Sequence, residues 1–124
     1  MAECCCSSDK QVKFLYACSG AANTGYLADN AARSLAKLGI GKMTCLAAMG
    51  GGLSGFVESA KAAGDNLVID GCSVACGKKI FENLGIPFNH FTMTDYGVEK
   101  GKTEITPELI SQTSFALAER IADE

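Results

Sequence analysis

The chain has 124 residues, enough for one domain with its own hydrophobic core. Hydrophobic residues make up 48% of it and charged residues 20%, which is a globular rather than a disordered composition. The formal net charge of -3, without a dense Lys/Arg cluster, argues against a nucleic-acid surface. No stretch reaches the ~18 apolar residues of a membrane helix, and the start shows no secretory signal pattern, so a cytoplasmic protein is expected.

The elements can be predicted in chain order from periodicity and turn residues. The first ten residues (MAECCCSSDK) show no periodicity and predict a disordered, cysteine-rich tail before a single α/β domain over residues 11–124. Strands are predicted at 12–17, 42–47, 67–69 and 90–93. Helices are predicted from 23 or 24 to 38, from 54 to 63, from 73 to 84, and from 107 to 121. Thr106 and Pro107 are the expected cap and first residue of the last helix.

Strands that alternate with helices of about ten residues indicate βαβ units and therefore a mostly parallel sheet covered by helices. The strands are short apolar runs without strict alternation, which is typical of burial on both faces. The predicted fold is a three-layer α/β/α sandwich with four or five strands, flavodoxin-like or Rossmann-like. A flavodoxin-like order, with the first strand inside the sheet, is preferred.

Seven cysteines are many for a chain without a secretory signal, and an odd number argues against a closed disulfide framework. In the predicted sheet all strands point the same way, and ligands bind beyond their carboxyl ends. Four cysteines follow or end strands in this scheme, and we expect them to gather at one edge of the sheet: Cys18, Cys45, Cys72 and Cys76. The remaining three, Cys4 to Cys6, belong to the tail.

The segment NLVIDGCSVACGKK at 66–79 predicts a strand, a turn and a helix in close succession. Cys72 and Cys76 are four residues apart and would lie on one face of that helix. Two thiols so placed can hold one metal ion or act as a reactive pair. Asp70 is expected to cap the helix or to support the cysteines, and Asp95 ends the next strand at the same edge. His90 opens that strand, so we expect it at the opposite edge in a structural role.

The chain resembles the DGC-domain family, whose members are described as zinc-binding proteins. The matching features are CSG at 18–20, MTCLAAMGG at 43–51, the signature DGC at 70–72 with Cys76 four residues later, and TD at 94–95. The resemblance spans about Phe14 to Tyr96. It implies that Cys18, Cys45, Cys72 and Cys76 are the family's cysteine set and that zinc is the metal.

Four thiolates suit tetrahedral zinc and also an iron–sulfur cluster. Cys45 lies inside a predicted apolar strand, where a plain core cysteine is an equal alternative. If Cys45 is not a ligand, three sulfurs remain, either with an open position or with Asp70 as the fourth ligand. A thiol-based enzyme or carrier is the alternative function. In that case Cys18 is a nucleophile or phosphocysteine in the loop CSGAANTG, or Cys72 and Cys76 are a redox pair.

Overall fold

The structure is a computed structural model that describes residues 12–123. Its centre is one four-stranded sheet in the order β3-β2-β4-β5, and every neighbouring pair of strands is parallel. The strands are β2 (Lys13–Ala17), β3 (Lys42–Met43), β4 (Asp65–Asp70) and β5 (Asn89–Thr92). The first of these strands lies inside the sheet, which confirms the predicted flavodoxin-like order. The predicted tail at 1–10 lies outside the described residues.

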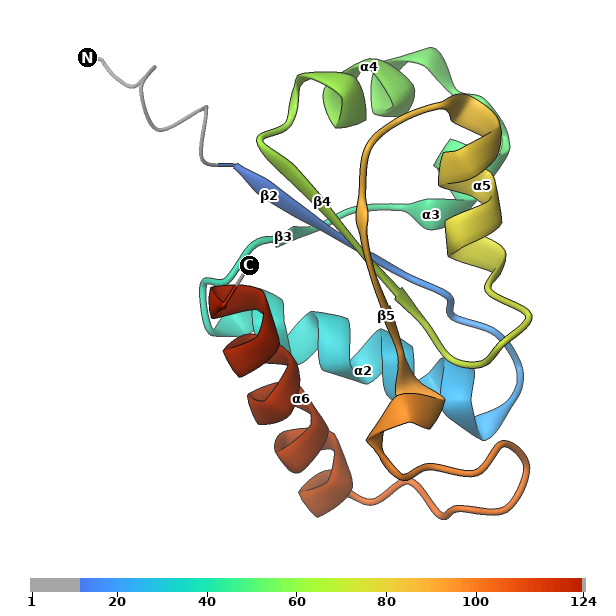
Figure 1. The fold of residues 1–124 in the computed structure, drawn as a ribbon, viewed down its shortest axis with the longest axis vertical. Coiled ribbons are helices and arrows are strands. Elements are labelled where there is room, and N and C mark those ends of the chain that lie inside the picture. The colour runs from blue at the N-terminus through green and yellow to red at the C-terminus, as the bar shows by residue number, and fades with distance from the viewer. Residues whose placement is uncertain (1–11, 124) are drawn as a thin grey trace.

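Helices cover both faces of the sheet (Figure 1). On one face lie α2 (Asn23–Lys37) and α6 (Pro107–Ala122). On the other face lie α3 (Leu46–Gly50), α4 (Ser54–Ala62) and α5 (Cys76–Leu84). A short 3-10 helix, η1 (Met93–Tyr96), follows β5. This arrangement confirms the predicted three-layer α/β fold.

The side chains of the central strands alternate between two apolar cores, as the two-residue period of a strand requires. Leu15, Leu67 and Ile69 pack against α2 and α6, whereas Tyr16 and Val68 pack against α3, α4 and α5. All five side chains are almost completely buried. Burial on both faces explains why these strands read as continuous apolar runs in the sequence.

Buried polar groups anchor β4 at its amino-terminal end. The Tyr16 hydroxyl donates to Asn66 Oδ1 at 2.9 Å, and Asn66 Nδ2 donates to the Ala60 carbonyl at 2.9 Å. The Tyr16 ring also meets Phe81 edge to face, with ring centroids 4.8 Å apart. These contacts tie the end of α4 and the helix α5 to the sheet, so they fix the layer that carries Cys76.

Two helix predictions are confirmed closely. Helix α4 begins at Ser54 as expected. In α6, Thr106 Oγ1 accepts a hydrogen bond from the Leu109 N–H at 3.1 Å, and Pro107 is the first helical residue. The cap and the proline therefore work as the sequence indicated.

The predicted strand over 42–47 is wrong in its second half. Pairing with β2 ends after Met43, with a last hydrogen bond from the Thr44 N–H to the Leu15 carbonyl at 2.9 Å. The chain then turns into α3, whose sequence LAAMG contains strong helix formers and no β-branched residue. Cys45 is consequently an exposed helix cap and not a buried strand residue, which removes the core-cysteine alternative for it.

The predicted helix over 73–84 begins three residues later, at Cys76. Residues 71–75 form a turn, in which Ala75 has the left-handed backbone conformation with φ 56°. The helix begins where Asp70 supplies hydrogen-bond acceptors for the N–H groups of Gly77 and Lys78. Cys72 therefore lies in the turn, and the expectation that Cys72 and Cys76 share one helical face is wrong.

The extent of the domain over 11–124 remains a prediction. Within residues 12–123, no helix combines the length and the apolar character needed to cross a bilayer.

Candidate thiol site

The candidate site lies at the carboxyl-terminal edge of the sheet, where β2 and β4 end side by side. Cys18 follows β2 directly, and its backbone N–H donates to the Ile69 carbonyl at 2.9 Å. Asp70 ends β4, and the turn after it leads to Cys76 at the start of α5. Residues 18 and 76, far apart in the sequence, are thus brought to one edge, as the parallel sheet predicted.

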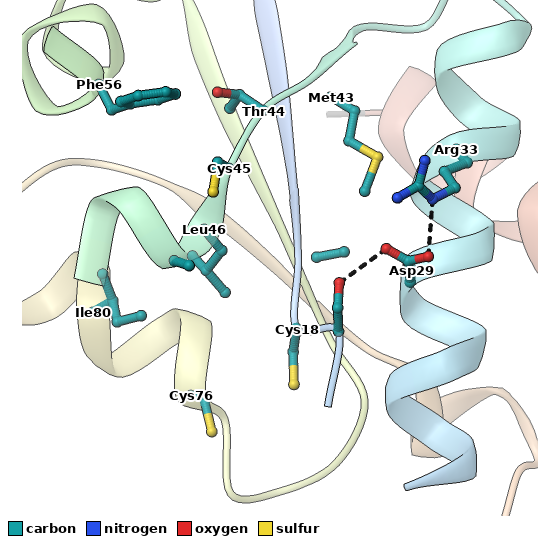
Figure 2. Close-up of a pocket in the computed structure, with 13 residues that line it drawn as sticks. Cys18, Asp29, Arg33, Met43, Thr44, Cys45, Leu46, Phe56, Cys76 and Ile80 are labelled. Carbon is teal, nitrogen blue, oxygen red and sulfur yellow. Dashed lines mark hydrogen bonds and ion pairs between the residues drawn. The ribbon is translucent and has the colours of Figure 1, made fainter. Parts of the chain in front are cut away.

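A groove of about 820 Å³ opens beside this edge (Figure 2). Helix α2 forms one wall with Asp29 and Arg33, and the opposite wall comes from α3, α4 and α5. Three of the four candidate cysteines line the groove: Cys18, Cys45 and Cys76. Its volume is within the range of small-molecule sites, roughly 300–1,000 Å³.

Polar groups on the α2 wall are joined in a chain of hydrogen bonds. The Ser19 hydroxyl donates to Asp29 Oδ1 at 2.9 Å, and Arg33 Nε donates to Asp29 Oδ2 at 2.9 Å. Figure 2 shows both contacts. Because Ser19 follows Cys18 directly, this chain holds the loop after β2 against α2. It thereby steadies Cys18 at the rim of the groove.

Cys76 lines the groove together with Cys18, and its neighbours affect its pKa. The pKa of the Cys76 thiol is raised, first by desolvation and then by the negative charges of Cys18, Asp70 and Cys72. A side-chain hydrogen bond with Cys18 adds to the same shift. Each of these contributions favours the neutral thiol over the thiolate. A metal cation bound next to Cys76 would have the opposite effect, because its positive charge stabilises the thiolate form.

The other two cysteines stand in different relations to this pair. Cys72 is half-buried in the turn after Asp70, close enough to Cys76 for its charge to act on that thiol. Cys45 is exposed across the groove, and its Sγ accepts a hydrogen bond from the Ala48 N–H at 3.4 Å. The groove is therefore lined by Cys18, Cys45 and Cys76, and Cys72 lies in the turn that leads to Cys76.

Asp70 joins the sheet to the first turn of α5. Its Oδ1 accepts from the Gly77 N–H at 2.9 Å, and its Oδ2 accepts from the Lys78 N–H at 3.0 Å. The carboxylate is buried, with 1% of the side chain exposed. Both oxygens are already used, so Asp70 is better suited to fixing the position of Cys76 than to binding a metal directly. The cap that the sequence predicted for Asp70 is present, although it reaches across the turn.

His90 is also placed differently from the prediction. Its Nε2 lies 2.8 Å from Asp70 Oδ2, so its ring reaches the same edge as the cysteines. Position 90 is opposite Val68 in the pairing of β4 with β5, two residues before the Asp70–Thr92 pair. Side chains two residues apart in a strand lie on the same face, which allows the ring to extend to Asp70. The register of the two strands was the missing information.

Asp95, expected at the same edge, is an exposed residue of η1. Within the described part of the chain, no group of three or more His, Cys, Asp or Glu side chains is arranged to hold a metal ion. The donor chemistry nevertheless fits zinc, because soft sulfur atoms are the available ligands. The observed positions therefore do not form a closed four-sulfur site.

Comparison with known families decides the classification: the DGC domain matches residues 14–117. The chain belongs to the DGC-domain family. The matched region includes all four candidate cysteines as well as Asp70 and His90. The resemblance recognised in the CSG, MTCLAAMGG and DGC segments is confirmed.

The chain is also similar to a bacterial relative of known name, the anaerobic and virulence modulator AnvM of Pseudomonas aeruginosa. The two are 29% identical over 116 residues, which covers 93% of this chain and 88% of AnvM. No solved structure matches the chain.

Proposed function

We propose that this DGC-domain protein binds a zinc ion through cysteine thiolates at the carboxyl-terminal edge of its sheet. Cys18 and Cys76 are the core of the site, Cys72 is the third ligand, and Cys45 is the fourth. The observation that supports this proposal is the position of Cys18, Cys45 and Cys76 along one groove, with Cys72 in the turn that leads to Cys76. Thiol-rich sites persist in reducing compartments, so the cytoplasm is the proposed location.

The raised pKa of Cys76 bears on how such a site would load. In the absence of a metal, desolvation and the neighbouring charges of Cys18, Asp70 and Cys72 favour its protonated form. Thiol ligands must lose their protons to bind a metal, so loading releases protons and strengthens as the pH rises. Bound zinc would supply the positive charge that makes several thiolates stable next to each other.

Cys45 would have to give up a contact to join the site. Its Sγ already accepts a hydrogen bond from the Ala48 N–H, and α3 has only five residues. A short helix on an exposed wall can shift at low cost. If Cys45 stays in place, the site holds zinc by three sulfurs and keeps one position open to the groove.

A site of this kind suits storage, delivery or sensing of metal. AnvM is named as a modulator, which agrees with a regulatory use of the site rather than turnover of a substrate. The alternative reading of Cys18 as a phosphocysteine gains no specific observation from the structure. An iron–sulfur centre uses the same ligands and is separated from zinc by the experiment below.

The experiment is a count of metal per chain in anaerobically purified protein by plasma mass spectrometry. The tail cysteines at 4–6 are changed to Ser in every sample, so that only the domain is measured. We expect about one zinc per chain, as for other structural thiolate sites, and loss of most of it in Cys18→Ser and in Cys76→Ser. Iron with acid-labile sulfide would identify a cluster instead.

Cys45→Ser is the comparison variant, because it removes the proposed fourth ligand, which lines the same groove and already accepts a hydrogen bond from the Ala48 N–H. Its zinc content is expected to fall less than that of Cys18→Ser. Full zinc content in both Cys18→Ser and Cys76→Ser, with native circular dichroism spectra, would refute the proposed site.

A further inference from the structure

The groove beside the cysteines has an apolar wall that the thiols do not account for. Three apolar side chains on α3, α4 and α5 line it: Leu46, Phe56 and Ile80. Phe56 keeps 41% of its surface exposed, and Figure 2 shows its ring extending from α4 toward Thr44, which also lines the groove. Small-molecule sites are mostly apolar, with a few well-placed polar groups. This wall can therefore receive the apolar body of a small ligand.

Arg33 supplies a charged group on the opposite wall, and Asp29 fixes its position. Arg33 Nε donates to Asp29 Oδ2 at 2.9 Å, and the Ser19 hydroxyl donates to Asp29 Oδ1 at 2.9 Å. Each carboxylate oxygen of Asp29 therefore accepts a hydrogen bond, and the guanidinium is held at its Nε only.

The two terminal nitrogens of Arg33 remain available to a ligand. Among residues 12–123, the contact with Asp29 is the only hydrogen bond or ion pair of this side chain. Figure 2 shows the terminal nitrogens directed toward Met43, which also lines the groove. Their N–H groups form a planar fork that matches the two oxygens of a carboxylate. Arg33 is thus oriented to receive the acidic group of a ligand.

Lys37 adds a second positive charge next to Arg33. A smaller hollow of about 490 Å³ adjoins the groove, because Arg33 and Met43 line both, and Lys37 lines the smaller one. Within the described part of the chain, Lys37 has no ion-pair partner. The charged side chains along the two hollows are Asp29, Arg33 and Lys37, so two positive charges and one negative charge give a net charge of +1. This balance suits a carboxylate, with one negative charge, better than a phosphate monoester, which carries about −1.5 to −2 at pH 7.

We propose that the groove binds a small organic monocarboxylate with an aromatic or branched apolar body. The carboxylate pairs with the terminal nitrogens of Arg33, with Lys37 about one helical turn away, and the apolar body packs against Leu46, Phe56 and Ile80. The groove volume of about 820 Å³ has room for such a molecule. This inference goes beyond the proposed zinc site, because it needs no metal and uses no cysteine to hold the ligand.

Three probes with the same naphthyl body test the role of charge. The full chain is reduced, freed of metal by a chelator, and titrated with naphthylacetate, naphthylacetamide and naphthyl phosphate in a calorimeter. We expect naphthylacetate to bind with a Kd of about 1 mM or below, as other ligands of its size do, and the neutral amide to bind about fivefold more weakly. The difference is modest because 65% of the Arg33 side chain is exposed. Undetectable binding of naphthylacetate, equal binding of the amide, or binding of the phosphate ester at least as tight would overturn the proposal.

Two substitutions with matched controls test the two walls separately. Arg33→Gln should weaken the binding of naphthylacetate about fivefold and leave that of naphthylacetamide unchanged, whereas Phe56→Ala should weaken the binding of both probes. The controls Arg120→Gln and Phe115→Ala change an exposed arginine and an exposed phenylalanine of α6, neither of which lines the groove. Both controls are expected to bind like the wild type. An equal loss for both probes in Arg33→Gln, or a comparable loss in the controls, would contradict the proposed site.

The position of the bound probe can be measured in the wild-type protein, so a variant that fails to fold does not affect this result. On addition of naphthylacetate, backbone amide signals in nuclear magnetic resonance spectra should shift in α2 around Arg33 and in α4 around Phe56, and those of α6 should not. Phe115 of α6 is the most exposed large apolar side chain of residues 12–123, and shifts centred on it would refute binding in the groove. Because metal is removed in every measurement, failure of this inference leaves the proposed zinc site standing, and absence of zinc from the purified protein leaves this inference standing.

Discussion

Replacement of Asp70 by asparagine tests whether the carboxylate holds the start of α5. The two side chains are nearly the same size, so the change removes charge and one acceptor rather than packing. Asp70 accepts hydrogen bonds from the N–H groups of Gly77 and Lys78 at 2.9 and 3.0 Å. In the variant the amide oxygen can serve only one of them, and the amide N–H₂ faces the other donor.

The size of the effect follows from the burial of these groups. A hydrogen bond to a charged group contributes about 1.5–3 kcal/mol, and the Asp70 side chain is only 1% exposed. Loss of one such bond, with a backbone donor left unpaired, should lower the free energy of unfolding by about 2–3 kcal/mol. Urea denaturation at pH 7, followed by far-ultraviolet circular dichroism, measures the free energy of unfolding of both proteins.

Asp65→Asn is the matched control, since Asp65 begins the same strand at the opposite edge. Its carboxylate accepts from Asn89 Nδ2 at 2.9 Å and lies 3.7 Å from Lys13 Nζ, with 27% of the side chain exposed. Such a partly exposed ion pair contributes about 0–1 kcal/mol. If Asp70→Asn destabilises the protein no more than Asp65→Asn does, the account of Asp70 as the anchor of α5 is incorrect.

Three further substitutions test the packing around the sheet. Gly77→Ala should destabilise the fold by about 1–3 kcal/mol, because the added Cβ would lie 2.6 Å from Val68 Cγ1. Gly55→Ala should be neutral or stabilising, because a Cβ at that position meets nothing within 4 Å. Chemical denaturation compares the stability of the two variants. Burial raises the pKa of Tyr16 to about 12, so the stability that depends on its neutral hydroxyl is complete below about pH 10 and is lost as the pH rises towards 12. Tyr16→Phe should cost about 1 kcal/mol at pH 7 but show a smaller loss of stability between pH 10 and 12, and an equal alkaline loss in both proteins would contradict this. Ala75→Gly should raise the melting temperature slightly, because glycine adopts the left-handed conformation of residue 75 (φ 56°) without the cost of about 1 kcal/mol that alanine has there. A lower melting temperature would show that the conformation is not strained.

The fold could be predicted from the sequence because its signals are local. Apolar strands, the glycines that follow α2, α4 and α5, and the Thr106–Pro107 start of α6 depend on neighbouring residues only. The order of the strands cannot be read from one sequence, and the preferred order with the first strand inside the sheet agrees with the structure. Parallel strands then placed Cys18 and Cys76 at one edge, as expected.

The details of the site depend on contacts between distant residues, and here the prediction was less accurate. Cys72 was assigned to a helix because the residues from 73 onwards have helical periodicity, but Asp70 delays the start of that helix to Cys76. Cys45 was assigned to a strand, although pairing with β2 ends two residues earlier. His90 could be placed only when the register of β5 against β4 was known.

The shortness of β3 has a consequence for the protein in solution. An edge strand with only Lys42 and Met43 offers few free backbone groups to another molecule, so this side of the sheet is a poor template for intermolecular strand pairing. The chain leaves the sheet there and turns into α3, which lies beside the groove. The same early departure that opens the groove next to Cys18 therefore also protects the domain from aggregation through its β3 edge.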